Sequence, residues 1–198
     1  MTEFFQPPDP PSFVAEPAPH EEWMGPARGE LPSVVPMERV VAETEEVAVY
    51  VDAFSVYTAG FELKLRVVAR DDESKLDPFG IDHRLTMQQT GEIAPELLRL
   101  GFQFSDGSKV TNTGAWAEAE VEGLRGRPEA PVMDETGGRW SEGTWSQGYW
   151  VWPLPPGDSF DLVCEWPAAD VPLTRTAIDA APIREAAARA RRPFSDAF

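Results

Sequence analysis

The sequence predicts an all-β protein: an antiparallel, immunoglobulin-like β-sandwich of about seven strands that ends in one short C-terminal α-helix. Apolar and polar residues alternate over several separate segments, which is the period of a half-buried strand. Turn signals separate these segments, and almost no helical pattern lies between them. The 198 residues include twenty prolines, fifteen glycines and seven tryptophans, a composition that favours short extended segments over long helices.

An acidic, proline-rich extended arm is expected over residues 1–36, followed by the β-sandwich domain over residues 37–198. Nine of the twenty prolines lie in the arm, and proline cannot continue a helix or a central strand. Through residue 60 there are eleven acidic residues against Arg28 and Arg39. The arm is interpreted either as a flexible solvated terminus or, because it also contains large apolar side chains, as an interaction element. In the second case it docks on its own domain or on a partner through Phe4, Phe5, Phe13 and Trp23.

Two hairpins are expected in the first half of the sandwich. Residues 47–57 are rich in β-branched and aromatic side chains, and residues 61–69 alternate strictly, so a short connection at residues 58–60 joins two strands. Residues 98–104 alternate as well and run into an Asp-Gly turn at Asp106, which favours a hairpin with a return strand over residues 109–113.

The C-terminal part predicts a third hairpin, a last strand and the helix. Residues 149–152 and 160–166 flank a turn rich in proline and glycine, and residues 171–178 form the last strand. Asp179 is a good N-cap for the alanine-rich helix at residues 183–192. This helix region is basic, and its arginines are expected to pair with the acidic arm, with the protein's own sheet or with another acidic subunit.

One part of the chain resembles other proteins. Residues 149–190, YWVWPLPPGDSFDLVCEWPAADVPLTRTAIDAAPIREAAARA, combine WVWPLPP with a following CEWP. This segment resembles the C-terminal part of a group of small acidic bacterial proteins that are functionally uncharacterised. The similarity covers about a fifth of the chain, and extends more weakly to FELKLRVVAR and LGFQFSDGSKV. The resemblance implies no activity, cofactor or site residue.

The charge and the cysteine content limit the partners and the compartment. Acidic residues outnumber basic ones by 34 to 17, so the formal net charge is −17. Nucleic acid and anionic membrane surfaces are therefore not expected as partners, because affinity for both comes mainly from lysine and arginine. The single Cys164 cannot form an internal disulfide, and the N-terminus shows no signal-peptide pattern, so a cytoplasmic protein is expected.

Catalytic signatures are absent from the sequence, and no cofactor is expected. Phosphate-loop, dinucleotide, nucleophile-elbow and zinc-helix motifs do not occur, and His20 and His83 do not suggest a catalytic triad. Cys164 lies on the apolar face of its predicted strand and is expected to be a buried, inert thiol. An acidic segment is interpreted as a solvated connection rather than a metal site, with weak Ca²⁺ coordination as the alternative, for which the candidate ligands are Asp71, Asp72 and Asp77.

A cluster of aromatic residues is the most unusual feature of the sequence. Four tryptophans and one tyrosine lie within thirteen residues among glycines, and the candidates for a binding surface are Trp140, Trp145 and Tyr149. Trp140 and Trp145 are expected in a loop. Such a group packs in a core, anchors a protein interface or stacks against a sugar or another small ligand.

These observations together predict a non-enzymatic interaction or structural-support protein with a protein partner or self-association. The alternative is a small-ligand or carbohydrate-binding module that uses the tryptophan-rich segment. An enzyme of unknown type is the third hypothesis.

The charge yields a first testable prediction. Binding to generic DNA or RNA near physiological ionic strength should stay weaker than micromolar, because the net charge of −17 opposes counterion release from the phosphates. A fluorescence-anisotropy titration over a salt series measures this affinity. Salt-sensitive submicromolar binding would contradict the prediction.

Overall fold

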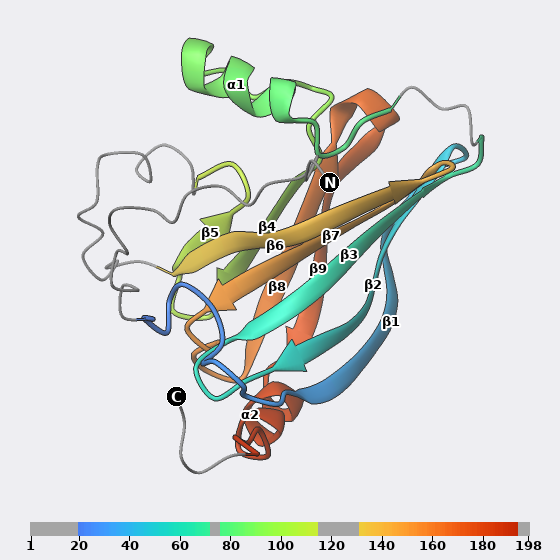
Figure 1. The fold of residues 1–198 in the computed structure, drawn as a ribbon. Coiled ribbons are helices and arrows are strands. Elements are labelled where there is room, and N and C mark those ends of the chain that lie inside the picture. Colours follow the sequence, from blue (N-terminus) through green and yellow to red (C-terminus); the bar gives the residue numbers. More distant parts are fainter. Residues whose placement is uncertain (1–19, 72–75, 115–130, 194–198) are drawn as a thin grey trace, which may run out of the picture.

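The computed structural model describes residues 20–71, 76–114 and 131–193, and these residues form two antiparallel sheets packed face to face (Figure 1). One sheet has five strands in the order β1-β2-β3-β7-β6, and the other has four in the order β5-β4-β8-β9. In chain order the strands are β1 (Ser33–Glu43), β2 (Val47–Val56), β3 (Phe61–Ala69), β4 (Arg99–Phe104), β5 (Lys109–Thr111), β6 (Val132–Ser141), β7 (Thr144–Trp152), β8 (Ser159–Trp166) and β9 (Val171–Asp179).

The predicted all-β sandwich is confirmed, and the described residues contain two strands beyond those predicted. β1 begins inside the region expected to be an extended arm, and β6 occupies a stretch whose sequence does not indicate a strand. Both are edge strands. An edge strand of this kind packs little of its surface against the core: in β1 only Val41 and Ala42 are buried, and in β6 residues 136–141 are all exposed. The apolar alternation that identifies a strand is therefore missing from both.

Two α-helices lie at opposite ends of the sandwich (Figure 1). The predicted C-terminal helix is α2 (Ala181–Ala187), shorter than expected, and the Asp179 carboxylate accepts a hydrogen bond from the Ala181 N–H at 2.8 Å. α1 (Ile81–Thr90) is an addition to the predicted elements, because its sequence IDHRLTMQQT has no apolar stripe. A one-turn 3₁₀ helix, η1 (Pro167–Ala169), precedes β9. Neither α-helix in the described part of the chain has the length and hydropathy needed to cross a bilayer.

The basic residues near α2 pair with the protein's own surface. Arg184 forms an ion pair with Asp158 at 3.2 Å, and Arg175 with Asp161 at 3.5 Å. Arg191 meets the N-terminal segment through its backbone, which exchanges two hydrogen bonds with Leu31.

The main core fills the space between the sheets. Alternating burial places one face of each strand in this core. In β3, Phe61, Leu63 and Leu65 are buried while the residues between them face outward. Phe61 packs edge to face against Phe102 of the opposite sheet, with ring centroids 5.6 Å apart. Phe160 packs against both rings. These contacts between the sheets hold them at a fixed separation.

A second, separate aromatic cluster covers the outer face of the five-stranded sheet. Successive β7 residues point to opposite faces, so Tyr149 and Val151 join the main core whereas Trp150 and Trp152 point outward. Tyr57 and Trp23 complete the outer cluster. Trp23 belongs to the N-terminal segment of residues 20–31, called the strap below, which precedes β1 and contributes this side chain to the outer cluster.

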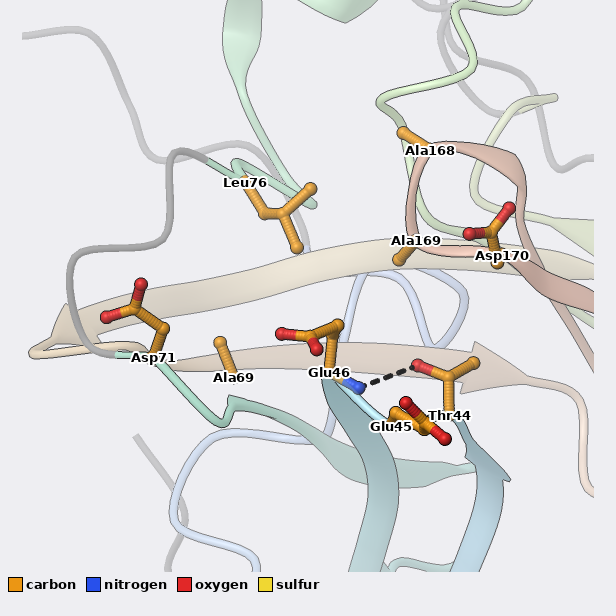
Figure 2. A pocket seen from close by; sticks show the side chains of 9 residues that line it. All are labelled: Thr44, Glu45, Glu46, Ala69, Asp71, Leu76, Ala168, Ala169 and Asp170. Carbon is orange, nitrogen blue, oxygen red and sulfur yellow. Dashed lines mark hydrogen bonds between the residues drawn. The ribbon is translucent and has the colours of Figure 1, made fainter.

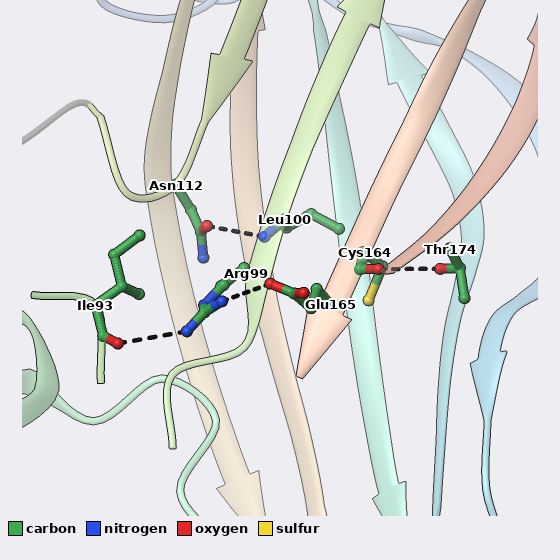
Figure 3. A network of polar contacts seen from close by, with 7 residues as sticks. All are labelled: Ile93, Arg99, Leu100, Asn112, Cys164, Glu165 and Thr174. Atoms are coloured by element: carbon green, nitrogen blue, oxygen red, sulfur yellow. Dashed lines mark hydrogen bonds and ion pairs between the residues drawn. The ribbon is translucent and has the colours of Figure 1, made fainter. Parts of the chain in front are cut away.

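Asn112 joins the end of the β4–β5 hairpin to the sheet (Figure 3). Its carboxamide oxygen accepts the Leu100 N–H at 2.8 Å, and its NH₂ donates to the Leu98 carbonyl at 2.8 Å. Next to it, Arg99 pairs with Glu165 across β4 and β8. Asn112 is buried, so these two hydrogen bonds replace ladder bonds that the short strand β5 does not supply.

The exchange of Asn112 for alanine should therefore destabilise the protein markedly. Asn112→Ala leaves one buried N–H and one buried C=O unpaired, with an expected loss of about 2–4 kcal/mol in the free energy of unfolding. Denaturant titration followed by tryptophan fluorescence measures the loss. Thr113→Ala, one residue along the same turn, is the control and should change stability by less than about 0.5 kcal/mol. Equal stabilities for the two variants would contradict the role of the Asn112 amide.

Candidate functional site

A pocket of about 550 Å³ lies at the end of the sandwich away from α2 (Figure 2). Three segments that are distant in sequence surround it: the β1–β2 turn, the end of β3 with the residues after it, and the connection from β8 to β9. The lining residues are Thr44, Glu45, Glu46, Ala69, Asp71, Leu76, Ala168, Ala169 and Asp170.

The β1–β2 turn holds two of the acidic side chains in place. The Thr44 hydroxyl oxygen accepts the N–H groups of Glu46 and Val47 at 3.3 and 3.2 Å, and the Thr44 N–H donates to the Val47 carbonyl at 2.9 Å. The Glu46 carbonyl in turn accepts the Arg70 N–H at 2.7 Å. The turn is thus tied both to itself and to the end of β3, so Glu45 and Glu46 project from a fixed backbone.

The opposite wall is formed by η1 and the residue that follows it. Asp170 ends this helix in the left-handed conformation, with φ 54°, and its N–H donates to the Pro167 carbonyl at 3.1 Å. Aspartate is among the few residues other than glycine that adopt this conformation readily. The Ala168 N–H donates to the Pro95 carbonyl at 3.0 Å, which anchors the wall to the segment before β4.

The pocket combines a small apolar floor with a negatively charged rim. Ala69 and Ala169 are buried, and Leu76 packs partly against the main core. Figure 2 shows the carboxylates spread around these alanines rather than gathered at one point. The rim carboxylates, all on exposed residues, belong to Glu45, Glu46, Asp71 and Asp170.

Three of the rim carboxylates have no cationic partner in the described part of the chain. Glu45, Glu46 and Asp170 form no ion pair with any described lysine, arginine or histidine. The pocket therefore presents uncompensated negative charge next to apolar surface. Such a lining suits the aliphatic stem and the charged head of an amphipathic cation.

Sequence patterns alone do not identify this pocket. Glu45 and Glu46 stand out only as part of the acidic N-terminal region, and nothing local marks Asp170. A weak signal does exist, because the motif Thr-Glu-Glu at residues 44–46 separates two strands and places two acids on one turn. Residues 44–46 come close to residues 168–170 only in the folded chain, so local sequence does not indicate that they share a pocket.

Of the three candidate metal ligands, the structure describes Asp71 and Asp77. Asp71 lies on the pocket rim and Asp72 lies outside the described residues, while the Asp77 side chain lies at the turn that leads to Gly80 and α1. No group of three or more His, Cys, Asp or Glu side chains in the described ranges is arranged to hold a metal ion.

The tryptophan-rich segment is a β-hairpin rather than a loop. Trp140 in β6 pairs with Trp145 in β7, and the two side chains differ sharply in exposure, at 63% and 5%. Tyr149 is fully buried in the main core. Trp140, Trp145 and Tyr149 therefore do not form a shared open surface.

Of the aromatic residues in the arm, Trp23 is the one that the structure describes. Its side chain is 5% exposed and packs in cis in the outer aromatic cluster. Phe4, Phe5 and Phe13 lie outside the described residues.

The thiol and the first histidine occupy structural positions. Cys164 is buried in β8, and burial, with a smaller effect from the Glu165 charge, raises the pKa of its thiol to about 12. A thiolate, the nucleophilic form, is therefore disfavoured. A ring nitrogen of His20 lies 3.1 Å from the Gly25 carbonyl and bridges the first turn of the strap.

Comparison with known proteins yields no relative: no family model, no curated protein and no solved structure matches the chain.

Cys164 should resist modification in the folded protein. Its pKa of about 12 and its burial predict that a disulfide reagent at mildly alkaline pH reacts about tenfold or more slowly with the native protein than with the denatured protein. The release of the reporter thiol, followed by absorbance, measures both rates. Equal rates would show that the thiol is accessible.

Proposed function

We propose that this protein is a non-enzymatic interaction protein that binds a basic segment of a protein partner at the acidic pocket. One observation carries the proposal: Glu45, Glu46 and Asp170, which pair with no described cationic side chain, border an apolar floor at one end of the sandwich. A lysine or arginine side chain complements both parts, because its alkyl stem contacts alanine and leucine while its charged head meets the rim.

The overall charge supports the same partner. With a net charge of −17, the protein attracts a basic partner over distance and accelerates its encounter with the surface. The pocket then adds a local contact of defined shape to this general attraction. The chemistry of the lining supports binding rather than catalysis, since it consists of carboxylates, small apolar groups and one hydroxyl, and the Thr44 hydroxyl oxygen already accepts two backbone hydrogen bonds.

A small organic cation is the second candidate ligand. The pocket volume of about 550 Å³ falls in the range typical of small-molecule sites, roughly 300–1,000 Å³. A polyamine or another amine with an apolar body satisfies the same lining. The tryptophan-rich segment does not carry this alternative, because Trp145 and Tyr149 are buried.

The experiment compares two charge-matched variants in their binding of oligolysine and of spermidine. The variant Glu45→Gln/Glu46→Gln removes two rim charges, while Glu22→Gln/Glu185→Gln removes two exposed charges in the strap and in α2. Both variants have the same net charge. Isothermal titration calorimetry of each variant and of the parent protein measures the affinities.

The pocket variant should bind oligolysine about fivefold more weakly than the parent, because each exposed ion pair contributes roughly 0.2–1 kcal/mol. The control variant should bind within about twofold of the parent. Equal losses in the two variants would mean that binding depends on the net charge, and would remove the pocket from the proposal. A preference for spermidine over oligolysine would favour the small-ligand alternative.

A further inference from the structure

Strand β6 forms one edge of the five-stranded sheet, and the second half of this strand is open to solvent. β6 pairs with β7 on one side and with no described strand on the other (Figure 1). Residues 136–141 are all exposed, and Trp140, at 63%, is the most exposed of the large apolar side chains that the structure describes. A register shift lies between Glu135 and Gly137, so the regular part of this edge begins at Gly137. Residues 137–141 are called the β6 edge below.

The turn between β6 and β7 fixes the hydrogen-bonding pattern of the hairpin. Glu142 and Gly143 both have positive φ, 42° and 71°, and they lie between the paired residues Ser141 and Thr144. Two left-handed residues in a two-residue loop are typical of a type I′ turn, which matches the twist of the flanking strands. The pair next to such a loop is a hydrogen-bonded pair, so the Ser141 N–H and C=O groups face β7.

Two residues of the β6 edge direct their backbone groups away from β7. Hydrogen-bonded and non-hydrogen-bonded pairs alternate along an antiparallel ladder. Arg139 therefore bonds to β7 as Ser141 does, whereas the N–H and C=O groups of Gly138 and Trp140 point to the open side. No described residue forms a hydrogen bond with these groups on that side. The edge thus presents donors and acceptors at the spacing that an added antiparallel strand needs.

The indole of Trp140 lies directly beside these backbone groups. Trp140 pairs with Trp145, so the two side chains lie on the same side of the sheet, the side that faces the main core. Trp145 is buried there, while Trp140 remains open at the edge of the sheet. An exposed indole at this position gives a side chain of an added strand a flat apolar surface to pack against.

The charge around the β6 edge indicates which kind of strand fits. Residues 132–152, which include both strands of the hairpin, contain three acidic side chains and one basic side chain, those of Asp134, Glu135, Glu142 and Arg139. The whole chain has a net charge of −17. A second copy of this chain is therefore repelled, whereas a basic segment is attracted.

We propose that the β6 edge binds an extended, basic segment of a partner protein as an added antiparallel strand. Hydrogen bonds to the backbone of Gly138 and Trp140 set the register, and the Trp140 indole packs against one side chain of the added strand. Lysine or arginine side chains of the segment meet the acidic surroundings. The β6 edge does not line the acidic pocket, so this inference does not rest on the proposed function.

Amide hydrogen exchange, followed by NMR on the full chain, tests the added strand directly. The probe is a synthetic octapeptide of alternating lysine and valine. At saturation it should slow the exchange of the Gly138 and Trp140 N–H groups by about fivefold or more, because each gains a hydrogen bond. The Arg139 and Ser141 N–H groups already bond to β7, and their exchange should change by less than about twofold.

A second peptide controls for charge. It has the same sequence with every backbone nitrogen methylated, so it keeps the lysine charges but cannot donate backbone hydrogen bonds to the edge. It should bind about tenfold or more weakly than the first peptide, as measured by isothermal titration calorimetry.

Two substitutions at one position separate the indole from the backbone donor. Trp140→Ala removes the indole and keeps the N–H, whereas Trp140→Pro removes both and leaves the bonds to β7 in place. The alanine variant should bind the first peptide about threefold more weakly than the parent, and the proline variant about tenfold or more weakly. Leu173→Ala removes another exposed apolar side chain, on β9, and should bind like the parent.

Three results would overturn the proposal. The first is the absence of measurable binding of the lysine-valine peptide. The second is binding that protects neither Gly138 nor Trp140, or that protects all four N–H groups equally, which would indicate general attraction by charge. The third is equal affinity of the alanine and proline variants. If Trp140→Pro does not fold, the exchange rates of the parent protein decide.

Discussion

Strand β7 is buried on both faces, and much of the arrangement follows from this double burial. Its inward residues, Tyr149 and Val151, require the four-stranded sheet as a partner layer, which makes the molecule a sandwich. Its outward residues, Trp150 and Trp152, require a cover of their own, which an edge-to-edge extension of the sheet cannot supply. The N-terminal segment provides that cover through Trp23. A chain with one sandwich core therefore has a second apolar contact, which joins its first described residues to the centre of a sheet.

The sequence predicts the elements whose burial repeats every second residue. In β3 and β8 the alternation is almost complete, because one face of each strand packs on the main core. The edge strands β1 and β6 lack this pattern, and α1 lacks an apolar stripe, so local sequence indicates none of the three. Trp145 pairs with Val67 of β3, and both side chains therefore lie on the face of the sheet that packs on the main core. A count of tryptophans per segment cannot show which side of a sheet each side chain occupies.

The strap and the acidic pocket differ in how far the sequence could reveal them. Trp23 is a large apolar residue in a proline-rich acidic region, and this local contrast by itself suggests a docked segment. The residues of the pocket show no comparable local contrast in the sequence. Its charges come from residues 45–46, 71 and 170, and only the folding of three separate connections brings them to one end of the sandwich. Acidity alone predicts a basic partner, whereas the position of its contact depends on tertiary structure.

The exchange of the Thr58 amide proton with solvent reports on the attachment of the strap, because this N–H donates to the Glu30 carboxylate. Most backbone N–H groups in the sheet donate to carbonyls of neighbouring strands, so they exchange with solvent deuterium only when the sheet itself opens. The Thr58 N–H instead donates to a side chain of the strap, while Tyr57 beside it donates to the Gly60 carbonyl within the turn. Detachment of the strap exposes the first amide and leaves the second protected. The ratio of the Thr58 exchange rate to the Tyr57 exchange rate therefore reports on detachment of the strap in the intact protein, separately from the opening of the sandwich.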